Sequence, residues 1–187
     1  MGGRRGPSSC TEKSGPVRRT IRTALFAAVT LAFLAPLTPA HAASTTGDLM
    51  ITHVRPNAAG ADVKDGKQVN LNGEYFIIKN VSKKTVDLGG WVPDITTNTY
   101  GRALPSYKLP AGAKAYVHTG SGTNRKDANG NHHVHRGYAR HVLPNDGKAK
   151  NPNLRLKKPG SADNNAAAGT VSACNWNVAA DGKTYTC

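Results

Sequence analysis

Residues 72–94, NGEYFIIKNVSKKTVDLGGWVPD, decide the fold, because they hold two dense apolar runs around one short polar turn. The run 74–80 is rich in aromatic and β-branched side chains, which predicts a strand, although a short apolar run does not by itself exclude a buried helix. Its apolar side chains fall on both faces, so we expect this strand to be covered on two sides. The run 86–92 is expected to be the return strand, with Trp91 as a large core anchor.

The first 42 residues have the pattern of a Sec-type signal peptide. A basic segment with five arginines precedes an apolar run at residues 24–35, and a small-x-small cleavage sequence, Ala-His-Ala, ends at Ala42. We expect cleavage after Ala42 and a secreted, extracellular protein. No transmembrane helix is expected to remain, because about a dozen apolar residues fall short of the ~20 that a spanning helix needs. An arginine pair at residues 18–19 leaves the twin-arginine export route open.

Removal of the predicted signal leaves residues 43–187, which we expect to form one domain with a single core. The whole chain has 25 Lys and Arg against 11 Asp and Glu, a net charge of +14. The signal holds six of the basic residues and one of the acidic residues, so 19 basic and 10 acidic residues remain, a net charge of +9. The expected mature protein is therefore basic in its own right.

Cys174 and Cys187 are the only cysteines that remain after removal of the signal, because Cys10 lies within it. In an exported chain this pair predicts a disulfide, with a contribution of ~3 kcal/mol for so short a loop. A metal-binding or redox pair is the alternative. The sequence argues against it, because there is no CxxC motif and no histidine beside either cysteine.

Frequent turn signals and little helical periodicity predict an all-β domain of about eight strands with the turn spacing of a sandwich. Residues 100–109 are interrupted by a proline, which indicates an edge or a bend, and residues 120–137 predict a long polar surface loop. The last two strands are expected to pair as a C-terminal hairpin that the disulfide closes. The expected strands span residues 49–54, 74–80, 86–92, 114–119, 138–143, 153–157, 171–176 and 183–187.

The paired motifs in residues 72–94 resemble the signature of the lamin tail domain family, in a form typical of exported bacterial proteins. In that family a glutamate opens a strand that ends in asparagine, and a D-L-x-G-W segment follows. Residues 109–120 and 141–147 resemble two later elements of the family, although Leu143-Pro144 and Lys148 depart from its pattern. The residues that match the paired motifs are Glu74, Asn80, Asp87, Leu88, Gly90 and Trp91.

The resemblance covers residues 47–187 and implies an immunoglobulin-like β-sandwich in which the six motif residues serve folding. It also implies a secreted, non-enzymatic binding or structural module for an extracellular or cell-surface partner. The residues agree with this, because Glu74 is the only glutamate after the signal and no G-x-S-x-G, HExxH or phosphate-binding glycine loop is present. We therefore expect no enzyme activity and no cofactor.

A histidine-rich segment supports an alternative function. His132, His133 and His135 could ligate zinc, copper or nickel through neutral imidazole nitrogens. With His141 nearby, the segment would suit a small exported metal-dependent hydrolase or nuclease. The simpler interpretation is an exposed polar loop that happens to be rich in histidine, because a nuclease would need a ββα-metal arrangement that a β-rich chain does not offer.

Basic side chains recur in turns and along one late strand and could form a positive surface for an anionic polymer. Cell-wall polymer, nucleic acid and acidic lipid headgroups are the candidate partners outside a cell, and such binding would weaken as salt rises. The alternative is that the charge serves only solubility. Aromatic residues are sparse, which argues against a platform for base stacking. The candidate binding residues are Lys83, Lys84, Lys148, Lys150, Arg155, Lys157 and Lys158.

Overall fold

The structure, a computed structural model, describes five stretches of the chain, all of them within the compact unit Pro39–Cys187. The expected signal peptide and the cleavage site after Ala42 lie outside the described residues. Among the helices that the structure describes, none has the length and apolar character needed to cross a membrane. The described stretches are residues 47–95, 102–145, 153–162, 167–177 and 179–187.

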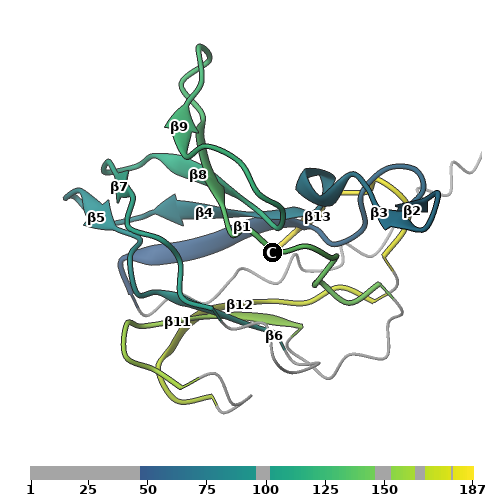
Figure 1. The fold of residues 1–187 in the computed structure, drawn as a ribbon. Coiled ribbons are helices and arrows are strands. Elements are labelled where there is room, and N and C mark those ends of the chain that lie inside the picture. The colour runs from purple at the N-terminus through teal and green to yellow at the C-terminus, as the bar shows by residue number, and fades with distance from the viewer. Residues whose placement is uncertain (1–46, 96–101, 146–152, 163–166, 178) are drawn as a thin grey trace, which may run out of the picture. The chain divides into compact units, whose positions relative to one another are not determined.

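A six-stranded sheet forms one layer of the domain (Figure 1). Neighbouring strands in this sheet run antiparallel, except that β10 runs parallel to β8. The strands are, in spatial order, β13 (Tyr185–Thr186), β1 (Leu49–Arg55), β4 (Tyr75–Asn80), β8 (Lys114–His118), β10 (His132–His135) and β9 (Arg125–Lys126).

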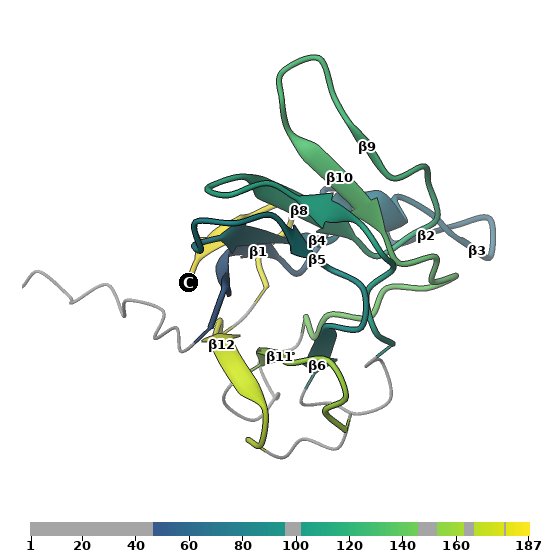
Figure 2. The same ribbon diagram turned by 90° about the vertical axis from the view of Figure 1, so that its left-hand side faces the viewer.

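A three-stranded antiparallel sheet forms the facing layer (Figure 2). Its strands are, in spatial order, β12 (Thr170–Cys174), β11 (Leu154–Lys157) and β6 (Val92–Ile95). Two short ribbons and a 3₁₀ helix complete the elements that the structure describes. They are β2 (Val63–Lys64) with β3 (Lys67–Gln68), β5 (Val86–Asp87) with β7 (Lys108–Leu109), and η1 (Leu71–Gly73).

The core lies between the two layers. Ile51 and Ile78 of the larger sheet and Leu154 and Leu156 of the smaller sheet are fully buried in one apolar cluster. Burial alternates along β8, as a strand with one face on the core requires. The backbone N–H of Ile51 also donates across the layers to Ser172 Oγ at 3.0 Å. The predicted immunoglobulin-like β-sandwich is confirmed.

Residues 86–92 do not return beside β4, which corrects the predicted hairpin. The chain pairs briefly as β5 with β7 and then crosses to the smaller sheet, where β6 pairs with β11. Asp87 Oδ1 holds this crossing by accepting hydrogen bonds from the backbone N–H groups of Gly89 (2.9 Å) and Tyr107 (3.0 Å). Gly90 adopts a φ of +81°, which glycine reaches without strain. These contacts are tertiary, so the apolar pattern alone could not show which sheet the second run joins.

The stretch 120–137, expected to be a loop, contains two strands, β9 and β10. β10 runs beside β8 and buries Val134 completely against the core, while His133 and His135 lie on the outer face. Its composition hid this strand, because Val134 is its only apolar residue. Residues 138–143 were expected to form a strand and form none.

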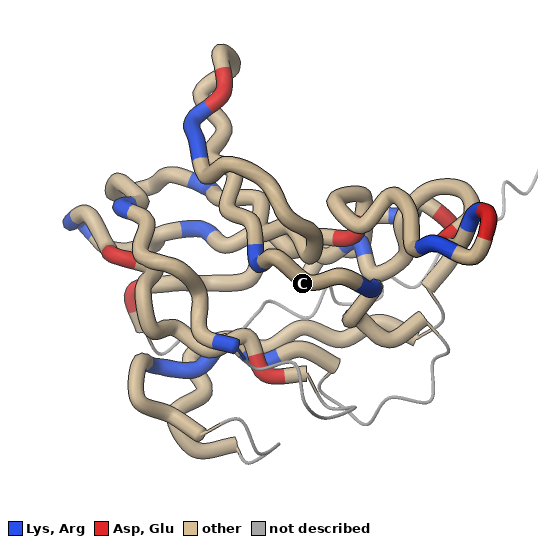
Figure 3. Tube along the Cα trace, viewed as in Figure 1, with Lys and Arg blue, Asp and Glu red and all other residues tan. Residues whose placement is uncertain are grey.

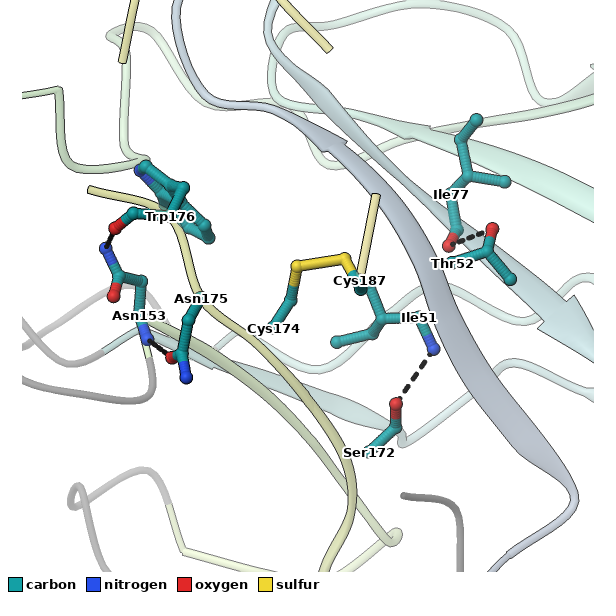
Figure 4. The surroundings of a disulfide bond; sticks show 9 residues. All are labelled: Ile51, Thr52, Ile77, Asn153, Ser172, Cys174, Asn175, Trp176 and Cys187. Carbon is teal, nitrogen blue, oxygen red and sulfur yellow. Dashed lines mark hydrogen bonds between the residues drawn. A yellow bond between two sulfur atoms is a disulfide. The ribbon is translucent and has the colours of Figure 1, made fainter. Parts of the chain in front are cut away.

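The predicted disulfide between Cys174 and Cys187 is confirmed (Figure 4). Its two cysteines belong to different layers, because Cys174 ends β12 of the smaller sheet and Cys187 follows β13, which pairs with β1. The backbone N–H of Cys187 donates to the carbonyl oxygen of Thr52 in β1 at 2.9 Å. The disulfide therefore closes the C-terminal segment by joining the two layers, and not by joining two paired strands.

Candidate anion-binding surface

The buried side chain of Asn80 organises one end of the sandwich. Its amide nitrogen donates hydrogen bonds to the carbonyl oxygens of Lys84 (2.7 Å), Leu109 (2.9 Å) and Pro110 (3.1 Å). Its amide oxygen accepts from the backbone N–H (3.0 Å) and the hydroxyl (2.7 Å) of Ser82. Asn80 thus ties the end of β4 to the turn before β5 and to the end of β7.

Basic side chains surround this hub. Lys79 precedes Asn80, and the register of β4 and β8 places Lys79 directly opposite Lys114. Figure 3 shows basic residues on neighbouring segments at the end of the domain where Figure 1 labels β5 and β7. We call the set the lysine end; it consists of Lys79, Lys83, Lys84, Lys108 and Lys114.

The lysine end carries more positive than negative charge. Lys84 Nζ lies 3.6 Å from Asp48 Oδ2, and Lys108 Nζ lies 2.9 Å from Asp87 Oδ2. The pKa of Asp87 is lowered, first by its hydrogen bond from Gly89 N–H and next by Lys108. The other three lysines form no ion pair with described residues. Like charges directly opposite each other on antiparallel strands repel, so an anion bound between Lys79 and Lys114 would relieve an unfavourable contact.

The three histidines that the sequence offered as metal ligands do not share a face. His132 is buried, and its Nδ1 lies 2.8 Å from the hydroxyl of Tyr107. His133 and His135 lie on the outer face of the sheet, beside His118 of β8. His132 therefore cannot join His133 and His135 in one site, which corrects the alternative of a metal site built from all three.

The outer-face rings are joined in a chain of hydrogen bonds. His118 Nδ1 lies 2.8 Å from the carbonyl oxygen of Asn72, His118 Nε2 lies 3.0 Å from His133 Nδ1, and His133 Nε2 lies 3.2 Å from Asp127 Oδ2. Burial lowers the pKa of His118 to about 4, and hydrogen bonds, first from Asn131, lower that of Asp127 to about 2. The ring nitrogens of His118 and His133 are engaged with one another and with oxygen atoms. Within the described stretches, no group of three or more His, Cys, Asp or Glu side chains is arranged to hold a metal ion.

Glu74 is fully buried and serves the fold. Its Oε1 accepts hydrogen bonds from the hydroxyl of Thr119 (2.6 Å) and from the backbone N–H groups of Val142 (2.9 Å) and Leu143 (3.0 Å). Its Oε2 lies 3.2 Å from His141 Nδ1. Burial raises the pKa of Glu74, and the hydrogen bonds oppose that rise. Glu74 therefore anchors the irregular segment that follows β10.

A family model described as Lamin Tail Domain matches residues 42–179. The chain belongs to the lamin tail domain family. No curated protein matches it. Lamin tail domains are immunoglobulin-like and are generally non-enzymatic binding or structural modules. In this lamin tail domain the motif residues Glu74, Asn80 and Asp87 are all occupied in holding backbone groups.

This lamin tail domain brings some of the predicted basic residues together and separates others. Lys83 and Lys84 belong to the lysine end, whereas Lys158 is exposed on the turn after β11. Arg155 is half-buried on β11, opposite Asp94. Lys148 and Lys150 lie outside the described residues.

Lys157 is not available to a polymer, which corrects the prediction for this residue. It is 1% exposed, and its Nζ lies 3.4 Å from Asp94 Oδ2 and donates to the carbonyl oxygen of Ala162 at 2.5 Å. A buried ammonium needs such partners, so Lys157 serves the interior of the domain.

Sequence reasoning missed three members of the lysine end: Lys79, Lys108 and Lys114. The alternation of the predicted strands could have placed Lys79 and Lys114 on outer faces. Only the register of β4 with β8 shows that these two lysines are opposite each other.

Proposed function

We propose that this lamin tail domain is an exported, non-catalytic module that holds an anionic polymer at its lysine end. The observation that carries the proposal is the pairing of Lys79 with Lys114, with three further lysines gathered by the Asn80 hub. Two like charges set opposite each other repel, and the lysine end adds three further positive charges to this pair. A polymer that places an anionic group between them turns this repulsion into attraction.

Charge and cysteine use support this function. The residues that follow the expected signal carry a net charge of +9, the difference between 19 basic and 10 acidic residues. A disulfide persists in oxidising compartments outside the cytosol. Cell-wall polymers and extracellular nucleic acid are the polyanions that an exported basic domain meets there, and their attraction is electrostatic and falls as salt screens it.

The experiment that tests this proposal measures binding to heparin, as a defined polyanion, over a range of salt concentrations. The double variant Lys79→Gln/Lys114→Gln is expected to bind more weakly and to show a smaller salt slope, by about one per lysine that contacts an anionic group. Chelator is expected to change nothing.

The chain offers a matched control in the double variant Lys64→Gln/Lys67→Gln. These two lysines also face each other across an antiparallel pair, on the β2–β3 ribbon, and both are exposed. The control removes the same charge, with Asp65 within the turn as a local counter-charge. Equal losses in both double variants would show that net charge alone attracts the polymer and would overturn the assignment to the lysine end.

A further inference from the structure

A pocket of about 460 Å³ lies beside the lysine end, and the proposed function does not use it. It opens between the start of β1 and the turn that follows β11. Its volume falls within the ~300–1,000 Å³ of pockets that bind small molecules. The residues that line it are Gly47, Asp48, Trp91, Lys158 and Pro159.

Glycines let the walls of this pocket approach each other. Gly90 precedes Trp91 with a φ of +81°, and a Cβ on it would lie 3.3 Å from Pro159 Cβ. A Cβ on Gly47 would lie 2.9 Å from Val171 Cγ1, closer than packed carbon atoms tolerate. The pocket is therefore formed by the family's Gly-Trp motif together with the turn after β11.

Asp48 connects this pocket to the lysine end. Asp48 is one of the lining residues, and its Oδ2 lies 3.6 Å from Lys84 Nζ. Its backbone carbonyl accepts a hydrogen bond from the N–H of Val81, in the turn that carries Lys83 and Lys84, at 2.9 Å. Asp48 therefore lies at the junction of the pocket and the lysine end.

The chemistry of the pocket suits a sugar ring. Asp48 offers a carboxylate that accepts hydrogen bonds, and Lys158 offers an ammonium that donates them, while Trp91 and Pro159 supply apolar wall. Sugar hydroxyls both donate and accept hydrogen bonds, so they match this pair of groups. Trp91 is only 7% exposed, so it does not present the open ring face on which a nucleobase stacks.

We propose that this pocket binds one sugar unit of an anionic glycopolymer whose charged groups lie on the lysine end. The identification of the polymer rests on the proposed function, but binding of the sugar unit does not. Neutral sugars in strong salt separate the two proposals, because at 1 M salt the screening length falls to ~3 Å, which weakens the attraction of the lysine end for charged groups but leaves direct hydrogen bonds to an uncharged sugar.

The test uses the fluorescence of Trp91. The chain has two tryptophans, and Trp176→Phe leaves Trp91 as the only one. In 1 M salt this variant is titrated with the neutral disaccharides cellobiose, lactose and chitobiose, and in parallel with thymidine monophosphate. At least one disaccharide is expected to change the emission saturably and the nucleotide is not. Adding Asp48→Asn or Lys158→Gln should weaken binding about tenfold, the loss of one charge-assisted hydrogen bond.

The control is Lys183→Gln, an exposed lysine that does not line the pocket. Near-ultraviolet circular dichroism shows whether each variant is folded, and both substituted pocket residues lie at the surface, so folding should be retained. No saturable change with any disaccharide up to ~10 mM, ten times a dissociation constant of ~1 mM, would overturn the proposal. A change that survives both substitutions, or binding of the nucleotide alone, would do the same. Heparin binding at low salt that depends on Lys79 and Lys114 would then still stand, so the two proposals can fail separately.

Discussion

At the scale of single residues, Glu74 shows how a carboxylate can serve the fold and no chemistry. It is fully buried, and its oxygens face the hydroxyl of Thr119, two backbone N–H groups and the ring of His141. Leaving buried donors without a partner costs about 1–3 kcal/mol each. The position therefore tolerates only a side chain that accepts several hydrogen bonds.

We expect Glu74→Ala to lower the free energy of unfolding by ~3 kcal/mol or more, because it leaves the buried backbone N–H groups of Val142 and Leu143 without an acceptor. Glu74→Gln keeps an oxygen for these donors and should lose clearly less. Urea unfolding of the two variants measures the difference. Equal losses for Ala and Gln would show that the hydrogen bonds of Glu74 do not stabilise the domain.

Comparison of Glu74→Gln with the wild type also tests how the stability of the domain depends on pH. The pKa of Glu74 in the folded protein is raised above its ordinary value of 4.5. Between pH 4.5 and the folded pKa, the folded state therefore holds a proton that the unfolded state has released. The contribution of this group to stability is therefore present below pH 4.5 and is lost as pH rises through the folded pKa. Glu74→Gln lacks this contribution, so its stability should fall less than that of the wild type over this range.

At the scale of elements, strand positions followed from the sequence better than strand partners did. Runs of apolar, aromatic and β-branched residues predicted β1, β4 and β8 to within one residue at their ends. The run 86–92 was misplaced because hydrogen bonds accepted by Asp87 and a left-handed Gly90 carry the chain from one sheet to the other. β10 was missed because a parallel strand with one buried valine has no local signal strong enough to outweigh three histidines.

The crossing between the sheets makes a prediction about Gly90. We expect Gly90→Ala to destabilise the domain by ~1–2 kcal/mol, because its φ of +81° disfavours any side chain and a Cβ would press on Pro159 at 3.3 Å. Gly60→Ala is the matched control, since Gly60 has a φ of +86° and open space around it. Thermal unfolding of both variants should show the larger loss for Gly90→Ala. A loss as large for Gly60→Ala would assign the whole effect to backbone conformation and none to the contact with Pro159.

At the scale of the whole described domain, the lysine end could be predicted only in part. Lys83 and Lys84 are adjacent in the sequence and were found, but Lys79, Lys108 and Lys114 join them through the register of β4 with β8 and through the Asn80 hub. Composition could not separate them from a lysine such as Lys157, which is buried beside Asp94. The pocket was likewise invisible, because its five residues come from three distant segments.

The disulfide acts at this largest scale, because it joins the two layers of the sandwich. Cys174 and Cys187 are 13 residues apart, and a loop of that length contributes ~3 kcal/mol by restricting the unfolded chain. We expect Cys174→Ser/Cys187→Ser to lose about that much stability in urea. Heparin binding by the protein that remains folded should be unchanged, because β1 still contacts β12 through the hydrogen bond from Ile51 to Ser172. A variant that stays folded and yet loses heparin binding would show that the disulfide sets the geometry of the lysine end as well as the stability of the domain.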